Sequence, residues 1–413
     1  MVTSMAAIAV LCFIARRLPV LFRMYRVGRR LARTRRAGFE IRSDWVILVP
    51  AWAEPEAAVT AWRFWKEQSR RSGVNFALVL SEHDSESQSV LTKALAPADI
   101  NSSESVLIAR GTSKAELITA SAIGLGDVAN GVMIFDSDSR PRGVIDVQCA
   151  VMTIPSVYKV TTACSFLLAG SAAWQTCWSL GFEHGMASRR RMWYVVGHGI
   201  GVEGRRLLDV GLSSDVLAED LLLGYRLSEI LPPEEVFACD TALDVAQWPA
   251  ALGEQTRMVA RWFWGDVQAA WSRLSARPIG ATLRVSELFI TWLLGPIVGF
   301  FGFILLLVEK DFAQAAAAAG AFVVLSVAPA VLLGRDFLPV DSYQDAGTYP
   351  RASGRLSDRP LGRLFLIPGL IARPVLDAAG ILLHARLVLR RGGTRPPTAK
   401  QNIESVHPTQ DQA

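Results

Sequence analysis

The stretch Val132-Met-Ile-Phe-Asp136-Ser-Asp138 decides the fold class of this chain. Four apolar residues followed directly by polar ones predict a buried strand that ends at Asp136. An Asp-x-Asp placed after such a strand brings two carboxylates to one place, where they repel each other unless a cation lies between them. The stretch therefore predicts a divalent cation, held by oxygen ligands, at the end of a core strand.

Short apolar runs and helical patterns alternate on the N-terminal side of this stretch. Trp45–Val49 and Phe76–Leu80 are predicted strands, whereas Glu56–Arg70 and Ser113–Ile123 have helical patterns. Strands that alternate with helices predict a parallel α/β sheet, which binds its ligands at the carboxyl ends of the strands. Chemistry is therefore expected just after each strand.

Acidic residues follow the two other predicted strands as well. Glu54 comes after the first strand, and Glu82, His83 and Asp84 follow the second. A single acid after a strand is usually a helix cap or a turn former. Three acidic segments that meet at one edge of a sheet predict a shared site.

Composition limits the class of protein. The chain has 413 residues, of which 51% are hydrophobic and 20% are charged, with a formal net charge of +5. These values exclude a disordered or collagen-like chain. The five cysteines are widely spaced and the five histidines are scattered, so neither a disulfide framework nor a Cys/His zinc site is indicated.

The hydrophobic residues are concentrated near the two ends of the chain. The runs Leu288–Val308 and Phe312–Gly334 contain no charged residue and are separated only by Glu309, Lys310 and Asp311. A bilayer core needs about 20 apolar residues of helix. The two runs therefore predict a transmembrane hairpin rather than a pair of buried core helices.

The N-terminal segment combines an apolar run with arginines. Met5–Ala15 is apolar, and the following Arg23–Arg36 is rich in arginine without a single acid. A cleaved signal peptide is disfavoured because its charge normally precedes the apolar run. The positive-inside rule keeps the basic segment cytoplasmic, so two structures stay open: a membrane-spanning helix, or a helix lying in the interface with its arginines on anionic head groups. Lipid is a nearer anionic partner than nucleic acid, which is not expected.

The C-terminal part contains a third apolar stretch, Leu364–Leu389, which is interrupted by Pro368, Arg373 and Asp377. Its basic flanks on both sides favour a re-entrant or interfacial element, with a third span as the alternative. The expected organisation of the chain is an N-terminal membrane helix with a basic segment (1–42), an aqueous domain (43–283), the hairpin (284–334), a basic loop with the third membrane segment (335–391) and a disordered tail (392–413).

A series of motifs in the aqueous domain resembles the membrane-attached, inverting glycosyltransferases of the family-2 type, which have the Rossmann-like GT-A fold. On the donor side, Val49–Glu54, Glu82–Asp84, Gly111–Lys114 and Asp136–Asp138 occur in the order of that family. On the acceptor side, Gly197–Gly199, Arg205–Gly211 and Leu217–Gly224 are similar to its later motifs, and Gln255–Trp262 is similar to its signature at the membrane face.

The resemblance implies a role for each matching residue. It makes Asp220 the catalytic base, and it places His198 and Glu219 on the acceptor side. Asp136 and Asp138 would bind Mg²⁺ or Mn²⁺. The implied donor-binding residues are Glu54, Glu82, Asp84, Lys114, Asp136, Arg261 and Trp262. From the residues alone, Glu219 and Asp220 are equally well a capping pair that opens a helix over Leu221–Ile230.

Within the family the chain is most similar to ceramide glucosyltransferases and related bacterial lipid glycosyltransferases. This likeness implies transfer of a sugar from a nucleotide sugar, in the first place a uridine diphosphate sugar, to the hydroxyl of a membrane lipid. It also implies an integral protein of the bacterial inner membrane with its catalytic domain in the cytoplasm. The alternatives are a polysaccharide synthase and a catalytically silent membrane scaffold.

One position departs from the family pattern. The signature Gln/Arg-x-x-Arg-Trp expects Gln or Arg three residues before Arg261, where this chain has Met258. Arg257 lies one position earlier and Gln255 lies further away. The sequence leaves open whether Arg257 takes over the role of the residue that the signature expects at position 258.

Overall fold

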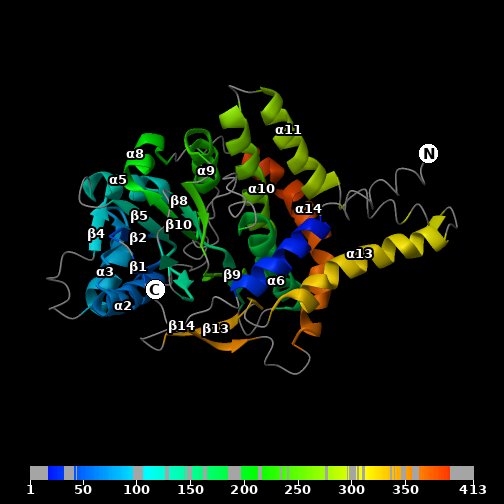
Figure 1. The fold of residues 1–413 in the computed structure, drawn as a ribbon, viewed down its shortest axis with the longest axis horizontal. Coiled ribbons are helices and arrows are strands. Elements are labelled where there is room, and N and C mark those ends of the chain that lie inside the picture. Colours follow the sequence, from blue (N-terminus) through cyan, green and yellow to red (C-terminus); the bar gives the residue numbers. More distant parts are fainter. Residues whose placement is uncertain are drawn as a thin grey trace, which may run out of the picture.

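The computed structural model describes residues 17–31, 41–42, 44–95, 106–125, 130–143, 145–146, 151–160, 165–184, 197–212, 216–232, 235–239, 241–274, 278–294, 312–334, 337–338, 340–345, 350–355 and 362–390, with the single residues 296, 304, 307 and 308. They form a sheet covered by helices on both faces, a smaller sheet, and a group of helices beside the two sheets (Figure 1).

The seven-stranded sheet has the strand order β11-β8-β10-β5-β2-β3-β4. Strands β2, β3, β4 and β5 are parallel, whereas β10 is antiparallel to both β5 and β8. This confirms the predicted α/β class with a largely parallel sheet. The strands are β2 (Val46–Ala51), β3 (Phe76–Ser81), β4 (Val106–Ala109), β5 (Gly131–Phe135), β8 (Val151–Thr153), β10 (Gly199–Glu203) and β11 (Val236–Ala238).

Both faces of this sheet are buried, and β2 shows how. Ile47 and Val49 pack into the cluster that contains tryptophans of α2, while Val46 and Leu48 pack into the cluster that contains Leu117 of α5. Strands covered on both faces read as continuous apolar runs, which is the pattern seen here. The covering helices are α2 (Pro55–Ser72), α3 (Ser85–Ala94), α5 (Lys114–Leu125), α8 (Gly204–Val210) and α9 (Glu219–Ile230).

Local sequence signals set the ends of α2. Pro55 occupies the first turn, where its missing N–H is not needed. Gly73 ends the helix in a left-handed conformation with φ of 70°, and its N–H donates to Ser69 O. The helix therefore starts directly after the turn that carries Glu54.

A five-stranded sheet, of order β14-β13-β9-β12-β6, lies beside the first one. Its strands are β6 (Arg140–Pro141), β9 (Ser156–Lys159), β12 (Leu243–Gln247), β13 (Val340–Asp345) and β14 (Pro350–Arg355). The segment predicted as a basic loop thus contains a hairpin that pairs with β9. A short pair, β1 (Ile41–Arg42) with β7 (Ile145–Asp146), completes the strands.

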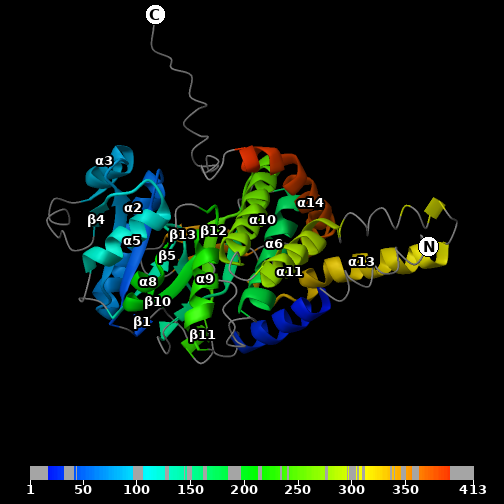
Figure 2. The same ribbon diagram turned by 90° about the horizontal axis from the view of Figure 1, so that it is seen from above.

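The helices beside the sheets pack closely on one another. They are α6 (Phe166–Trp178) with the π-helical turn η3 (Ser179–Glu183), α10 (Leu252–Leu274), α11 (Pro278–Phe289) with η5 (Ile290–Leu294), α13 (Phe312–Leu332), and η8 (Leu364–Leu366) with α14 (Ile367–Arg390). Figure 2 shows α14 next to α10 and α6. Glycines permit this contact, because a Cβ atom on Gly170 of α6 would lie 2.5 Å from Leu370 N of α14.

A buried polar network joins α14 to α6. Arg373 is only 1% exposed, and its guanidinium donates to Asp377 Oδ2 at 2.8 Å, to Gln175 Oε1 at 2.7 Å and to Ser171 O. The same guanidinium lies over the ring of Trp248, 5.1 Å from its centroid. A buried arginine is tolerated only when it is paired in this way. These contacts tie α14 into the domain that carries the sheets.

Two helices are long and apolar enough to cross a membrane, by length and composition alone: Phe312–Leu332 and Leu364–Ala385. The most apolar window of the first is 29% buried within the protein, and that of the second is 50% buried. Of the predicted first arm of the hairpin, Leu288–Val308, the structure describes residues 288–294, which belong to α11 and η5, and the single residues 296, 304, 307 and 308. The segment predicted as re-entrant or as a third span is therefore a helix that is partly buried within the protein, where it packs on α10, α6 and α13.

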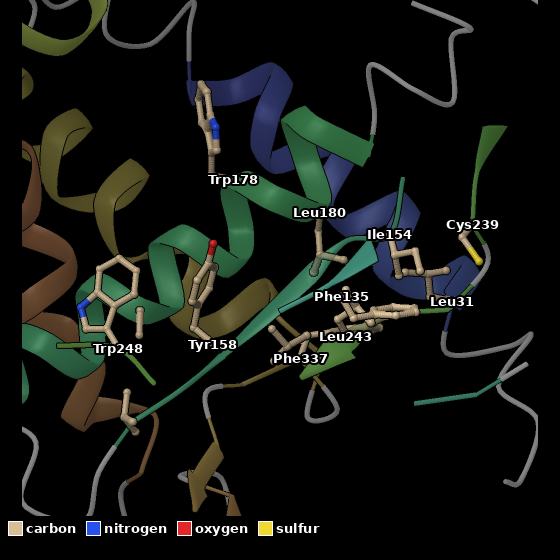
Figure 3. Packing of buried hydrophobic residues seen from close by; sticks show 14 of the residues in the cluster. Leu31, Phe135, Ile154, Tyr158, Trp178, Leu180, Cys239, Leu243, Trp248 and Phe337 are labelled. Atoms are coloured by element: carbon tan, nitrogen blue, oxygen red, sulfur yellow. The ribbon is translucent and has the colours of Figure 1, made fainter. Parts of the chain in front are cut away.

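The N-terminal helix, residues 17–31, packs on the same group of helices. Met24 and Leu31 are buried in the main core, and Figure 3 shows Leu31 among the residues of this cluster, which also contains Leu180 and Ile154. Arg17 is also buried, with its guanidinium 3.9 Å from the ring centroid of Trp174 and within 3.5 Å of Ser326 Oγ of α13. One continuous core therefore includes the sheet, the N-terminal helix and parts of α13 and α14.

Candidate active site

Hydrogen bonds tie together the carboxyl ends of β2, β3 and β5. Ala53 N, after β2, donates to Asp84 Oδ2, after β3, at 2.8 Å. Ser137 Oγ, after β5, donates to Glu54 Oε2. The three acidic segments that follow the predicted strands therefore meet at one edge of the sheet.

Asp84 shapes the turn after β2. Its side chain is 8% exposed, and its second oxygen, Oδ1, accepts from Ser87 N at 3.1 Å as the cap of α3. Ala53 has φ of 50°, a left-handed conformation that costs a non-glycine residue energy. The hydrogen bond from Ala53 N to Asp84 stabilises this strained turn, so Asp84 holds the backbone next to Glu54.

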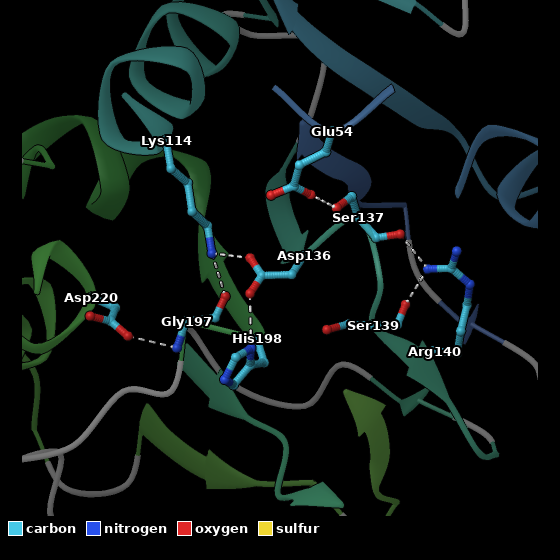
Figure 4. Close-up of polar contacts among 9 residues, drawn as sticks. All are labelled: Glu54, Lys114, Asp136, Ser137, Ser139, Arg140, Gly197, His198 and Asp220. Carbon is cyan, nitrogen blue, oxygen red and sulfur yellow. Dashed lines mark hydrogen bonds and ion pairs between the residues drawn. The ribbon is translucent and has the colours of Figure 1, made fainter. Parts of the chain in front are cut away.

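Asp136 lies at the centre of the site, between the side chains of Lys114 and His198 (Figure 4). Lys114 Nζ donates to Asp136 Oδ1, and His198 Nδ1 lies 2.8 Å from Asp136 Oδ2. Sheet pairing explains the second contact, because Phe135 at the end of β5 is the partner of Gly199 at the start of β10. The residues next to that pair, Asp136 and His198, are thus brought face to face.

The electrostatics of these three groups reinforce one another. Burial alone raises the pKa of Asp136, but the Lys114 ammonium and the His198 hydrogen bond outweigh it and hold that pKa far below its ordinary value. Burial lowers the pKa of Lys114 and of His198, and the Asp136 carboxylate reverses both shifts to a net rise. The site therefore holds one carboxylate between an ammonium and an imidazole that favours its protonated form.

The peptide at Gly197 connects this cluster to Asp220. Gly197 O accepts from Lys114 Nζ at 2.7 Å, and Gly197 N donates to Asp220 Oδ2 at 2.9 Å. A Cβ atom at this position would lie 2.7 Å from Asp220 Oδ2, so any other residue would have to displace that carboxylate. Figure 4 shows the resulting chain of contacts from Asp220 through Gly197 and Lys114 to Asp136.

Asp220 lies in the first turn of α9, and its Oδ1 accepts from Leu221 N at 2.9 Å. The N-cap position of this helix is Ala218 rather than Glu219 or Asp220. Burial raises the pKa of Asp220, and the negative charge of Glu219 adds to the rise. A carboxyl with a raised pKa at a helix start is suited to accept a proton.

Three other predicted site residues, Glu82, Glu219 and Asp138, either act on the cluster through their charge or pair with a residue outside it. Glu82 is exposed, with its carboxylate 3.6 Å from Arg110 Nε after β4. Glu219 is half-buried beside Asp220, and its charge contributes to the raised pKa of Lys114. Asp138 is half-buried in the turn after β5, and its charge contributes to the raised pKa of His198.

Aromatic rings join Trp262 to His198. Trp262 of α10 lies 6.0 Å from Trp248, which lies 5.2 Å from Tyr158, which in turn lies 5.8 Å from His198, each distance being between ring centroids. Trp248 also receives the Arg373 guanidinium on its ring. The buried network around Arg373 of α14 is therefore linked to His198 through the rings of Trp248 and Tyr158. Arg261 is half-buried, one residue before Trp262.

The three residues considered for the irregular signature before Arg261 differ in their burial. Met258 packs against the main core, and Arg257 is exposed with its Nε 3.3 Å from Gly253 O of its own helix. Gln255, by contrast, is fully buried, and its Nε2 donates to Ser171 Oγ at 2.7 Å. The polar side chain that this turn of α10 directs inward is Gln255.

Glu183 is a feature that sequence reasoning missed. It ends the π-helical turn after α6 and is 6% exposed, and among the described residues its Oε2 has no hydrogen-bond partner. Burial raises the pKa of Glu183 to about 7, against a hydrogen bond from Ser179 that lowers it, and the charge of Asp220 adds to the rise. π-Helical turns are frequent at functional sites. An acid that follows a long apolar helix was the only signal in the sequence.

The raised pKa of Glu183 predicts a pH-dependent loss of stability. The folded carboxyl titrates near 7 and the unfolded one near its ordinary 4.5, so between these values the folded state binds more protons and stability falls as pH rises. Glu183→Gln removes this titration. The free energy of unfolding of the wild type relative to Glu183→Gln is expected to fall by about 3 kcal/mol from pH 4.5 to pH 8, measured by denaturant titration at each pH. A pH-independent difference would contradict the raised pKa.

Carboxylate ligands for a divalent cation are few at this site. Within the described part of the chain no group of three or more His, Cys, Asp or Glu side chains could hold a metal ion. The two oxygens of Asp136 instead contact Lys114 and His198. Mg²⁺ is commonly bound by only one or two carboxylates, with substrate phosphates and water as its other ligands. A cation at the end of β5 would therefore need ligands from a bound substrate.

No protein-family model matches this chain, and no curated protein matches its sequence. Among solved structures, it is similar to the mannosyltransferase PcManGT from Pyrobaculum calidifontis in complex with GDP-Man and Mn²⁺, with 14% identity, a TM-score of 0.45, and coverage of 92% of this chain and 99% of that one. It is also similar to S. aureus TarS 1–349, with 10% identity, a TM-score of 0.29, and coverage of 81% and 91%. Likenesses at these TM-scores do not assign a function.

Proposed function

We propose that the protein is an inverting glycosyltransferase of the GT-A type that transfers a sugar from a nucleotide sugar to the hydroxyl of a membrane lipid. The observation that carries the proposal is the Gly197 peptide, which joins Asp220 to Lys114 and Asp136 at the carboxyl ends of the strands. It places a carboxyl with a raised pKa next to a cationic group suited to a diphosphate. These are the two groups that transfer to an alcohol requires.

In the proposed reaction, Asp220 accepts the proton of the acceptor hydroxyl while that oxygen attacks the anomeric carbon. The bond between this carbon and the diphosphate breaks, and the nucleoside diphosphate departs with both bonding electrons. Lys114 lies where it can contact the diphosphate, because its ammonium is only partly buried and already bonds Asp136 and Gly197 O. Attack opposite to the leaving group inverts the anomeric carbon.

A divalent cation, bound by Asp136 and Asp138 together with the diphosphate, would add positive charge next to the leaving group. We propose Mg²⁺ or Mn²⁺ and a uridine diphosphate sugar. Glu54, Glu82, Asp84, Arg261 and Trp262 complete the proposed donor side, whereas His198 and Glu219 belong to the proposed acceptor side. Asp84 acts there through the turn at Ala53, whose N–H it holds.

A lipid acceptor is proposed because the site is built onto candidate membrane helices. Arg373 of α14 lies on the ring of Trp248, which is two ring contacts away from His198. We propose that α13 and α14 are embedded in the bilayer of a bacterial inner membrane, with the sheets on the cytoplasmic side. A hydroxyl at the membrane surface would then be close to Asp220.

Product partition tests the proposed function. Membranes with and without the protein are incubated with a panel of radiolabelled nucleotide sugars and Mg²⁺ or Mn²⁺, and the products are separated into an organic phase and a high-molecular-weight precipitate. Protein-dependent label in the organic phase is expected. Label in the precipitate would instead favour a polysaccharide synthase. Donor binding without label from any donor would favour a silent scaffold.

Asp138→Asn tests the proposed metal site. Asp136 is less suitable, because its substitution also removes the partner of Lys114 and His198. In Asp138→Asn, the Mn²⁺ concentration at half-maximal binding of uridine diphosphate is expected to rise about 10–100-fold, measured by calorimetric titration. Asp209→Asn, an exposed aspartate on α8, is the matched control. An unchanged Mn²⁺ requirement would remove Asp138 from the metal site.

A further inference from the structure

The helix of residues 17–31 has two distinct faces. Val20, Leu21, Met24, Val27 and Leu31 are buried against the rest of the protein. On the opposite face, Leu18 is 51% exposed, Phe22 is 61% exposed and Tyr25 is 41% exposed. Residues at these spacings form one stripe along a helix. Three large apolar side chains therefore face outward next to one another.

Two arginines continue the same stripe toward the end of the helix. Arg26 lies with its guanidinium 5.6 Å from the ring centroid of Phe22, and Arg29 donates to the hydroxyl of Tyr25 at 3.0 Å. Both arginines are exposed. Within the described part of the chain, neither guanidinium pairs with a carboxylate. The stripe is thus apolar at Leu18 and Phe22 and cationic at Arg26 and Arg29.

The stripe lies next to one of the candidate membrane helices. Arg17, one residue before Leu18, contacts Ser326 of α13, whose neighbours Val323 and Val324 are 41% and 63% exposed. Figure 2 shows the N-terminal helix, in dark blue, beside the end of α13 that lies toward α6. The outward apolar side chains of the two helices therefore belong to the same side of the molecule.

We infer that this stripe docks on an anionic lipid surface, with Leu18 and Phe22 inserted among the acyl chains and Arg26 and Arg29 on the phosphates of the head groups. The order of the residues supports this occupant over a second copy of the chain. Apolar, then aromatic, then cationic side chains follow one another along the helix as they do across a membrane interface. The cluster of arginines without an acid is complementary to negative head groups.

This inference depends on the membrane location in the proposed function but not on the transfer reaction. It assigns residues 17–31 to the interface, which they would contact through one face only. The opposite face, from Val20 to Leu31, is buried in the main core, so the helix cannot be surrounded by lipid. The docked stripe would hold the catalytic sheets at a fixed orientation on the membrane.

Site-specific photo-crosslinking tests the inference. The full chain, with p-benzoylphenylalanine in place of Phe22, is reconstituted in nanodiscs of phosphatidylcholine and phosphatidylglycerol, irradiated and analysed by mass spectrometry. Lipid adducts are expected, with phosphatidylglycerol enriched about fivefold over its share of the lipid. The same substitution at Ile123, which is 64% exposed on α5, is the matched control and should give no lipid adduct.

A second variant separates charge from apolar insertion. Arg26→Gln with Arg29→Gln is expected to remove the enrichment of phosphatidylglycerol, whereas Arg63→Gln with Arg70→Gln, which removes the same charge from α2, should leave it unchanged. Persistence of the enrichment in the stripe variant would overturn the assignment to anionic head groups.

A crosslinker at Val324 of α13 distinguishes the failure of this inference from that of the membrane proposal. Lipid adducts at Val324 but none at Phe22, or protein adducts alone at Phe22, would overturn the docked stripe only. Lipid adducts at neither position would overturn the membrane location of α13 as well, and the stripe with it. Equal lipid labelling of Phe22 and Ile123 would show no specific docking and would also overturn the stripe.

Discussion

Replacing Asp220 with asparagine is expected to lower the rate of sugar transfer about 10²–10⁴-fold, which is the usual contribution of a general base. The asparagine keeps the shape of the side chain, and its oxygen can still accept from Gly197 N or from Leu221 N. It cannot take up the proton of the acceptor hydroxyl. Binding of the nucleotide should stay nearly unchanged, because Lys114 and Asp136 are untouched. Initial rates and calorimetric nucleotide binding are measured on the same preparations.

The control for this variant is Asp209→Asn, the same chemical change at an exposed position of α8. It should leave both transfer and nucleotide binding unchanged. If Asp220→Asn retains most of its activity, Asp220 is not the base. If Asp220→Asn loses nucleotide binding together with transfer, the carboxylate supports the donor side through Gly197 instead.

The second large effect is expected on the free energy of unfolding when Arg373 of α14 is replaced. Arg373→Met leaves Asp377 buried without its cationic partner and frees Ser171 O and Gln175 Oε1 from their donor. Breaking a buried ion pair in this way costs about 3–5 kcal/mol. The free energy of unfolding, measured by denaturant titration with tryptophan fluorescence, is therefore expected to fall by that amount.

Two further variants make this prediction specific. Arg63→Met, at an exposed position of α2, should change the free energy of unfolding by less than about 0.5 kcal/mol. Arg373→Met combined with Asp377→Leu should recover part of the lost stability, because an apolar pair replaces the unpaired charge. If the double variant is as unstable as the sum of its single changes, the two residues do not act as a pair.

The strands and the acidic turns of the donor side could be predicted from the sequence. Apolar runs such as Trp45–Val49 are nearly identical to the observed β2, because a strand buried on both faces leaves an unbroken apolar signal. The meeting of Glu54, Asp84 and the turn after β5 followed from parallel order alone. These features depend on local sequence and on one general rule of sheet geometry.

The contacts that complete the site could not be predicted in this way. The pairing of Lys114 with Asp136 and of Gly197 with Asp220 joins residues that lie far apart in the chain, and no local pattern encodes such distances. The burial of Glu183, whose Oε2 lacks a hydrogen-bond partner among the described residues, likewise depends on what packs around a π-helical turn. The apolar run Leu364–Leu389 has the composition of a membrane helix, yet it is partly buried within the protein, and its Arg373 has partners on α6.

The position of Arg373 in the sequence also has a consequence for the timing of synthesis. A ribosome releases the sheet, Asp220 and Trp248 well before it releases α14. Until then Gln175 and Ser171 lack the guanidinium that binds them, and Trp248 lacks the cation on its ring. The packing behind His198 is therefore finished only when nearly the whole described chain has left the ribosome. A nascent chain would carry the proposed catalytic carboxylate of Asp220 for some time before this packing is complete.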